Sequence, residues 1–334
     1  MSVALRVSSF FSSRSLLAFI TPVAFVISVQ WASHLLLGRP VGQLKGKNSE
    51  QATNPGRQET PAKKYPTELL YVHIPPDAEG PEPEYGTIIY RTKGKFIDQG
   101  GTAIIERLPS GEVVKTPIPN PYVPFEEEDA RRNMRLEAEI YHKLGSNPYI
   151  PKVFAWDEDS CCLTMEFMEH GNLREYVRSH RDAIPSHVRF KWSRQAAGGL
   201  RLLHENNVIH CDVSPRNFLL DHELDLKICD FGGSSLNGSR PSAFVSTRYC
   251  PPNYSWDDSP RWSDDVFSLG SLIYFIMTDE YPYEEVQSDE VQARYNSLQF
   301  PDVSGTACGS IIQDCWHQRI DAAQVCEALK RQFP

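Results

Sequence analysis

The amino-acid sequence predicts an α+β fold, in which a small antiparallel β-sheet precedes a larger and mostly helical half. Short β-branched runs separated by Gly or Pro between residues 87 and 115 are typical of strands in hairpins. From residue 125 onward, apolar residues recur at helical spacing, as in helices that bury one side. The 334 residues are 40% hydrophobic and 23% charged, which suffices for one large domain with additional segments and excludes wholesale disorder.

The first 39 residues are basic and partly apolar. Arg6, Arg14 and Arg39 occur there without any Asp or Glu, and residues 16–37 contain no charged side chain. A membrane-spanning helix needs about 20 apolar residues. We therefore expect residues 1–39 to be a leader, with membrane attachment through a transmembrane helix in residues 16–37 of a cytoplasm-facing protein. The arginines and serines ahead of this run also suit a mitochondrial targeting segment, and an inaccurate chain start is the third alternative.

Residues 40–92 are expected to form a linker, because eight prolines lie between residues 40 and 84 among few apolar residues. The pattern of apolar residues then changes to short β-branched runs, which are typical of strands. The predicted strands are residues 87–90, 96–98, 103–108 and 112–115, with a turn at Ser110-Gly111.

Helical spacing begins in residues 125–144, where Met134, Glu137, Ile140 and Tyr141 share one side. Two apolar runs follow at residues 150–155 and 162–167. The remaining predicted helices are residues 173–180, 187–205, 266–277 and 322–332.

The charge balance argues against nucleic acid as a partner. Lys and Arg number 34 and Asp and Glu number 43, so the formal net charge is −9. Binding to a phosphate backbone requires clustered excess cations. The eight cysteines contain no CxxC pair, and a reducing compartment is the simplest interpretation.

Two motifs contain side chains that are suited to catalysis and metal binding. Asp212 and Asn217 lie five residues apart in a polar loop between apolar runs, and a predicted strand ends at Asp230-Phe231-Gly232. Carboxylate and amide oxygens are ligands that Mg²⁺ accepts, so Asn217 and Asp230 suit a metal that bridges phosphates. Asp212 suits the orientation of a hydroxyl nucleophile.

These motifs resemble those of the eukaryotic protein kinase family. The other matching segments are Val113-Val114-Lys115, the register position of Glu137, Met165 to Met168, Leu219, Asp265 to Gly270, and Cys315-Trp316 with Arg319. The resemblance extends over residues 93–334. It implies a bilobal protein kinase-like fold, with a small antiparallel β N-lobe that has one helix (93–168) and a larger, mostly α C-lobe (169–334).

The resemblance also implies a phosphotransferase that uses ATP and Mg²⁺ and acts on a protein substrate. Lys115 would hold the α and β phosphates with Glu137 as its partner, and Asp212 would accept or orient the substrate's hydroxyl proton. The implied catalytic residues are Asp212, Lys115, Glu137 and Arg216, and the implied metal ligands are Asn217 and Asp230. The implied ATP-binding residues are Ile97, Gly100, Ile105, Val113, Lys115, Met165, Glu166, Met168 and Leu219. Two further structural roles are implied, an anchor of the catalytic loop at Asp265 and a stacked column of His210, Phe231, Tyr141 and Val153.

The sequence departs from the family in two places near these residues. In the segment aligned with the Gly-rich loop only Gly100 is in register, because Asp98 and Ala103 replace the other two glycines. A Cβ restricts the approach of the backbone to phosphates and Asp98 adds negative charge, so we expect weak nucleotide binding. Cys211 replaces the Arg of His-Arg-Asp, so activation by loop phosphorylation is not expected.

Three functions are compatible with these residues. The first is an ATP-dependent protein kinase, more plausibly directed at Ser/Thr than at Tyr, although Ser214 and Arg216 leave the hydroxyl class ambiguous. The second is a catalytically weak or inactive pseudokinase that acts as a binding or scaffold module. The third is a small-molecule kinase, against which Asp230-Phe231-Gly232 and the region around Cys315-Trp316 argue.

Overall fold

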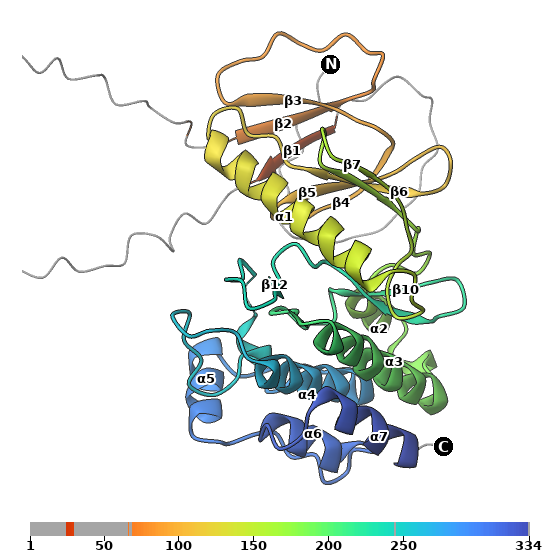
Figure 1. Ribbon diagram of the computed structural model, residues 1–334, viewed down its shortest axis with the longest axis vertical. Helices are drawn as coiled ribbons and strands as arrows, with labels where there is room; N and C mark the ends of the chain where they lie inside the picture. Colours follow the sequence, from red (N-terminus) through yellow and green to blue (C-terminus); the bar gives the residue numbers. More distant parts are fainter. Residues whose placement is uncertain (1–24, 30–65, 67–68, 244, 333–334) are drawn as a thin grey trace, which may run out of the picture. The chain divides into compact units, whose positions relative to one another are not determined.

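The computed structural model describes residues 25–29, 66, 69–243 and 245–332 (Figure 1). The chain forms two compact units, one of Met1–Lys93 with Pro119–Glu127 and the other of Gly94–Ile118 with Glu128–Pro334. All residues predicted for the catalytic, nucleotide and metal sites belong to the second unit.

In the first unit, three strands form a sheet in the order β1-β2-β3. β1 (Phe25–Val29) is antiparallel to β2 (Leu69–Ile74), and β2 is parallel to β3 (Thr87–Arg91). The Tyr71 hydroxyl donates to the Pro119 carbonyl at 3.1 Å. The structure thus differs from the predicted linker over residues 40–92, because β2 and β3 lie inside that range. The missed strand β2 has four buried residues in succession, so it lacks the alternation that identifies a half-exposed strand.

The predicted transmembrane helix over residues 16–37 needs correction. None of the helices in the described part of the chain is long and apolar enough to span a bilayer. The part of this segment that the structure describes, Phe25–Val29, is strand β1 and pairs with β2. Its β-branched residues Val26, Ile27 and Val29 fit a strand better than a helix. The prediction of membrane attachment through a helix is therefore withdrawn, and the other residues of 16–37 lie outside the described residues.

The second unit begins with a five-stranded sheet in the order β4-β5-β6-β8-β7, in which all neighbours are antiparallel. Gly111 has a φ of 98° in the turn between β5 and β6, a conformation that favours glycine. The hairpins predicted from residues 96–98, 103–108 and 112–115 are confirmed, whereas the predicted strand 87–90 is β3, which pairs with β2 in the other sheet and, within the described residues, joins no hairpin. The strands are β4 (Lys95–Gln99), β5 (Ala103–Arg107), β6 (Val113–Pro117), β7 (Val153–Asp157) and β8 (Cys162–Met165).

Helix α1 (Pro124–Leu144) buries the side that the sequence predicts. Met134, Ile140 and Tyr141 join the same apolar cluster as Val113 and Leu163 of the sheet. Glu137 also lies on this buried side, and a carboxylate there requires a partner.

The helical half follows, with α3, α4, α6 and α7 stacked in the lower part of Figure 1, where α3 packs against α4 and α7, and α4 against α6. The helices are α2 (Leu173–Ser179), α3 (Ser186–Glu205), α4 (Trp262–Thr278), α5 (Ser288–Asn296), α6 (Gly309–Trp316) and α7 (Ala322–Gln332). The sequence did not predict α5 and α6, which are short and depend on packing rather than on a long apolar period.

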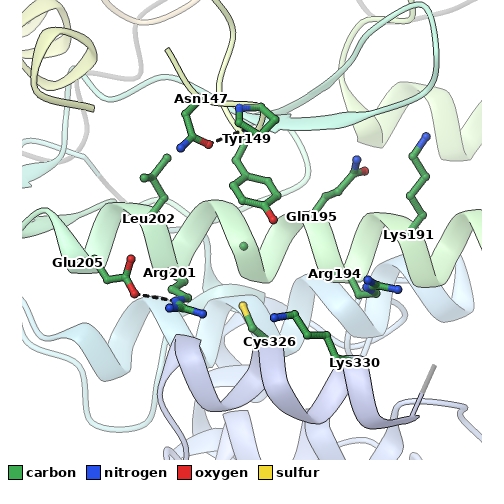
Figure 2. Close-up of a pocket in the computed structure, with 12 residues that line it drawn as sticks. Asn147, Tyr149, Lys191, Arg194, Gln195, Arg201, Leu202, Glu205, Cys326 and Lys330 are labelled. Carbon is green, nitrogen blue, oxygen red and sulfur yellow. Dashed lines mark hydrogen bonds and ion pairs between the residues drawn. The ribbon is translucent and has the colours of Figure 1, made fainter. Parts of the chain in front are cut away.

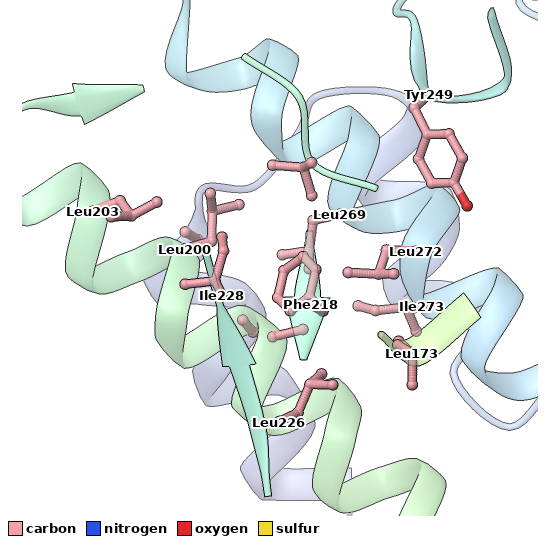
Figure 3. Close-up of a cluster of buried hydrophobic side chains, with 14 of the residues drawn as sticks. Leu173, Leu200, Leu203, Phe218, Leu226, Ile228, Tyr249, Leu269, Leu272 and Ile273 are labelled. Carbon is pink, nitrogen blue, oxygen red and sulfur yellow. The ribbon is translucent and has the colours of Figure 1, made fainter. Parts of the chain in front are cut away.

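Four short strands form two hairpin-like pairs inside this half. Phe218 and Ile228 gather with Leu200 of α3 and Leu272 of α4 in the apolar core (Figure 3). This packing fixes the two loops that begin and end at the strands. The pairs are β10 (Phe218–Leu220) with β11 (Leu226–Ile228), and β9 (Val208–Ile209) with β12 (Ser235–Leu236).

Candidate active site

Lys115 lies at the centre of the site. It stands in the middle of β6, and its Nζ is 2.6 Å from Oε2 of Glu137 on α1 and 2.6 Å from Oδ1 of Asp230 after β11. The Lys115 and Glu137 side chains are 10% and 2% exposed, whereas the Asp230 side chain is about half exposed. The structure therefore brings together three residues that are far apart in the sequence, and the open side of Asp230 faces solvent.

Lys115 and Asp230 hold each other ionised, whereas burial raises the pKa of Glu137 above its usual value. Burial disfavours the charged form of Lys115, but Asp230 and Glu137 outweigh that cost and raise the pKa of Lys115 above its usual value. The Lys115 ammonium in turn lowers the pKa of Asp230 against the opposing effect of burial. At neutral pH, the site thus presents a fixed cation beside a carboxylate.

The catalytic-loop segment between β9 and β10 holds Asp212 and Asn217. The Asn217 Nδ2 donates to the backbone carbonyl and to Oδ2 of Asp212, both at 2.8 Å. Burial raises the pKa of Asp212 to about 6, although His210 and the hydrogen bond from Asn217 oppose the shift. Asp212 thus combines a fixed orientation with a pKa near neutrality, which suits a proton acceptor.

Asp265 on α4 anchors this segment, as the sequence predicts. Its carboxylate accepts the backbone amides of His210 at 2.7 Å and of Cys211 at 2.9 Å, and His204 Nε2 lies 3.1 Å away. Cys211 has a φ of 64°, a left-handed conformation that costs free energy for a residue with a Cβ. The two hydrogen bonds that the Asp265 carboxylate accepts offset that cost. His204 is a member of this anchor that the sequence analysis missed, and its helical position carried no signal.

The predicted aromatic contacts of His210 are confirmed. The Phe231 ring lies 5.8 Å from His210 and 4.8 Å from Tyr141, measured between ring centroids. His210 Nδ1 accepts the Asp212 amide at 3.2 Å, so its Nε2 is the donor to the Cys229 carbonyl at 3.0 Å. These contacts connect α1 with the segments that hold Asp212 and Asp230.

Most of the apolar residues predicted to bind ATP come from several strands, β5, β6, β8 and β10, and from the segment after β8. Val113, Met165 and Met168 are buried, and Ile105 and Leu219 are half-buried. The Glu166 amide donates to the Lys152 carbonyl at 2.8 Å, and the Met168 carbonyl accepts the Gly171 amide at 3.1 Å. Within the described part of the chain, this pattern leaves the Glu166 carbonyl and the Met168 amide for a ligand, whose edge would need one donor and one acceptor. The half-buried Glu166 side chain pairs with Lys227 at 2.9 Å.

The predicted phosphate loop lies in the β4–β5 hairpin and is more open. Ile97 is 42% exposed, and the Gly100 amide donates to the Ala103 carbonyl at 2.9 Å, which closes the turn. A Cβ on Gly100 would meet only the Ala103 carbonyl oxygen, at 3.9 Å, among the described atoms. The turn itself therefore does not require glycine. Asp98 is exposed and its carboxylate accepts the Gln99 amide at 2.8 Å.

The side-chain oxygens of Asn217 and Asp230 fit a magnesium ion that is bound together with a nucleotide. Asn217 uses its amide nitrogen for the bonds to Asp212, so its amide oxygen remains for a cation, and Asp230 supplies a carboxylate. Mg²⁺ is commonly held by one or two such oxygens together with substrate phosphates. Among the described residues, no three His, Cys, Asp or Glu side chains are clustered to hold a metal by themselves. A site that is completed by phosphates agrees with both observations.

A cavity of about 600 Å³ between α3 and α7 contains none of the predicted site residues (Figure 2). It is lined by several cationic side chains, but Lys191 pairs with Asp225, Arg201 with Glu205 and Lys330 with Glu327. These pairs leave little uncompensated charge for an anionic ligand.

Comparison with known proteins agrees with this arrangement. The model of the protein kinase domain family matches residues 122–328. Mitogen-activated protein kinase kinase kinase 12 of Rattus norvegicus is 30% identical over 165 residues, which are 47% of this chain and 18% of that protein. Aurora kinase B of Drosophila melanogaster is 32% identical over 181 residues, 52% of this chain and 53% of that protein. Serine/threonine-protein kinase plk-1 of Caenorhabditis elegans is 25% identical over 234 residues, 67% of this chain and 36% of that protein.

The matched region is thus about half or less of the length of each of these relatives. The family match nevertheless covers more than half of this chain. It begins after β6 and covers α1, strands β7 and β8 and nearly all of the helical half of the bilobal α+β architecture. This chain therefore belongs to the protein kinase family.

Proposed function

We propose that this chain is an ATP-dependent protein kinase that transfers the γ-phosphate of Mg-ATP to a hydroxyl of a protein substrate. The observation that carries this proposal is the bridge from Lys115 to both Glu137 and Asp230, each at 2.6 Å. The bridge sets a cation and a metal-binding carboxylate side by side. Phosphoryl transfer depends mainly on such positioning and electrostatic stabilisation.

Each residue has a defined part in this proposal. Lys115 orients the α and β phosphates, and Glu137 holds Lys115 in place. Asn217 and Asp230 hold Mg²⁺, which when bound neutralises charge that develops on the transferred group. Asp212 accepts or orients the proton of the attacking hydroxyl, and Arg216, which is exposed beside it, adds positive charge near the reacting groups.

We further propose that the hydroxyl belongs to Ser or Thr. One relative, the plk-1 protein, is named a serine/threonine-protein kinase. The loop residues Ser214 and Arg216 do not distinguish a Ser or Thr hydroxyl from a Tyr hydroxyl, so an experiment is needed to decide between them.

The test is to incubate the full chain with Mg²⁺, ATP labelled on its γ-phosphate, and generic protein substrates. We expect labelled phosphoserine or phosphothreonine in the substrate, and loss of the label with Asp212→Asn and with Lys115→Met. Transfer by the natural chain that does not exceed the transfer by these variants would show that the proposal is wrong. Phosphotyrosine alone would reject the Ser/Thr assignment and keep the kinase.

A second candidate is a binding module without catalytic activity, and the observation that favours it is Asp98. This exposed carboxylate lies in the hairpin that would cover the phosphates, where its negative charge opposes them. Calorimetric titration with Mg-ATP separates this candidate from an active kinase that was given an unsuitable substrate. Absence of Mg-ATP binding together with absence of transfer favours the second candidate.

A further inference from the structure

A cavity of about 330 Å³ adjoins Asp212 on the helical half of the second unit. Three arginines line it, namely Arg174, Arg216 and Arg248, whereas Asp212 is the only carboxylate among the described residues of its lining. The other polar residues of the lining carry hydroxyl groups, namely Ser214, Ser246, Thr247, Tyr249, Tyr281 and Ser288. The cavity therefore combines excess positive charge with hydroxyl donors directly beside the proposed proton acceptor.

The arginines come from three separate segments of the chain. The Arg174 amide donates to the Pro215 carbonyl at 3.1 Å, which fixes the start of α2 against the loop that carries Arg216. Arg248 lies in the short 3-10 helix Thr247–Tyr249, and its Nη2 donates to three backbone carbonyls, at 2.7 Å to that of Val286. The fold thus fixes the Arg248 guanidinium and the backbone position of Arg174, whereas Arg216 is exposed to solvent.

Several donors in this lining lack an acceptor. In the part of the chain that the structure describes, the Tyr249 hydroxyl, Arg174 Nε and Arg248 Nε are buried without a hydrogen-bond partner. Tyr249 is 2% exposed. Figure 3 shows its hydroxyl pointing away from the apolar side chains of the core. Arg174 Nε is 3.8 Å from the Glu175 carboxylate, beyond hydrogen-bond distance.

Unpaired buried donors are costly, so their presence around one cavity indicates a ligand that supplies acceptors. Burial raises the pKa of Tyr249 well above its usual value. The hydroxyl therefore stays protonated and able to donate at neutral pH. Guanidinium groups and hydroxyl-bearing residues that line one cavity match the oxygens of a phosphoryl or carboxylate group.

We propose that this cavity binds a phosphorylated or acidic side chain of the protein substrate, close in sequence to the hydroxyl that accepts phosphate. This proposal rests on the proposed function, because it assigns Asp212 to that hydroxyl. A phosphoserine is preferred over Asp or Glu, since its charge is near −2 and it offers three acceptor oxygens. The substrate class is thus a peptide that already carries a negative charge.

The first test measures binding without catalysis. The full chain is treated with phosphatase and repurified, so that no phosphate of its own occupies the cavity. It is then titrated with fluorescent peptides that differ only in phosphoserine, Glu, Ala or Arg at a position near a central serine. We expect the phosphoserine peptide to bind about tenfold more tightly than the Ala peptide, the Glu peptide to lie between them, and the Arg peptide to bind most weakly.

Arg174→Gln and Arg216→Gln test the cavity itself. Each is expected to reduce the ratio of phosphoserine to Ala peptide affinity to nearly one. Arg132→Gln is the matched control, because it removes the same charge from the exposed side of α1 and does not line the cavity. Equal reduction by Arg132→Gln would show a nonspecific effect of net charge and overturn the proposal.

The second test measures phosphate transfer to the same peptides. We expect the same order in kcat/KM, with labelled phosphate on the central serine. A preference for the phosphoserine peptide in binding, with no transfer to any peptide, would reject the proposed function and retain the acidic-peptide site. Transfer with equal kcat/KM for the phosphoserine and Ala peptides, together with equal binding, would reject the site and retain the kinase.

Discussion

The Lys115 centre and the β4–β5 hairpin both face the proposed phosphates, yet they are built in opposite ways. The Lys115 and Glu137 side chains are 10% and 2% exposed and are joined by a 2.6 Å ion pair. In the hairpin, Ile97 is 42% exposed, and the exposed Asp98 carboxylate accepts a hydrogen bond from the amide of its own neighbour, Gln99. The part that positions charge is therefore buried and mutually constrained, whereas the part that would cover the phosphates is open and carries an opposing charge.

This difference indicates which substitutions the site tolerates. A buried charge pair cannot lose one member without leaving the other uncompensated. An exposed hairpin loses little when one side chain changes. Substitutions at the Lys115 centre should thus alter both stability and transfer, whereas substitutions in the hairpin should alter nucleotide affinity alone.

The largest effect is expected for Lys115→Met. It leaves the Glu137 carboxylate buried without its partner, which should lower the free energy of unfolding by about 3 kcal/mol. It should also reduce phosphate transfer by at least about a hundredfold. Chemical denaturation and a labelled-ATP assay measure the two quantities.

The double variant Lys115→Met/Glu137→Leu is the control for this prediction. It removes both charges and should recover most of the lost stability, because an apolar pair avoids the desolvation cost. Transfer should remain absent. Recovery of transfer along with stability would contradict the proposed role of Lys115.

The next effect concerns Asp265, which holds the loop behind the Lys115 centre. Asp265→Asn replaces an acceptor of two backbone amides and should destabilise the fold by about 2 kcal/mol. Transfer should fall by roughly tenfold or more, because Asp212 is no longer held in place. Asp264→Asn changes the same charge on the neighbouring residue, which bonds Arg261 instead. An equal loss of transfer in both variants would contradict the anchor.

The pH dependence follows from the pKa of Asp212, which burial raises to about 6. The carboxylate form accepts the proton, so kcat/KM should be constant above this pKa and fall about tenfold per pH unit below it. Stability should change in the opposite direction. The folded state binds the proton more tightly than the unfolded state, so the contribution of Asp212 to stability declines as pH rises from about 4 to 6. A kcat/KM that stays flat down to pH 5 would show that Asp212 is not the acceptor.

The smallest effect is expected in the hairpin. Asp98→Gly removes negative charge near the phosphates and should lower the KM for ATP by about threefold, with little change in the free energy of unfolding. Asp98→Asn removes the charge and keeps the Cβ, so it separates electrostatics from backbone freedom. An unchanged KM in both variants would indicate that the hairpin does not approach the nucleotide.

Much of the site was predictable because its motifs are local. Asp212 and Asn217 share one short loop, and Asp230 ends a strand, so each pattern is visible within a few residues. The partner of Lys115 was predictable from the helical register, since Glu137 lies on the apolar side of α1. In contrast, the cavity beside Asp212 was not predicted, because Arg174, Arg216 and Arg248 occur in separate segments without a shared pattern.

In the leader, by contrast, the sequence predicted a helix that the structure does not contain in the described residues. Residues 16–37 have the composition of a membrane helix, yet the described part forms strand β1 with β2 as its partner. Composition measures apolarity, whereas the choice between helix and strand depends on which segment is available for pairing.

The sequence by itself determined the family, the order of sheet and helices, and the residue types of the proposed centre, because these depend on local pattern. Only the tertiary structure decided that Lys115 contacts both Glu137 and Asp230, that burial raises the pKa of Asp212, and that three arginines surround one cavity. Distances and burial arise from packing between segments that are far apart in the chain, and no local pattern specifies them.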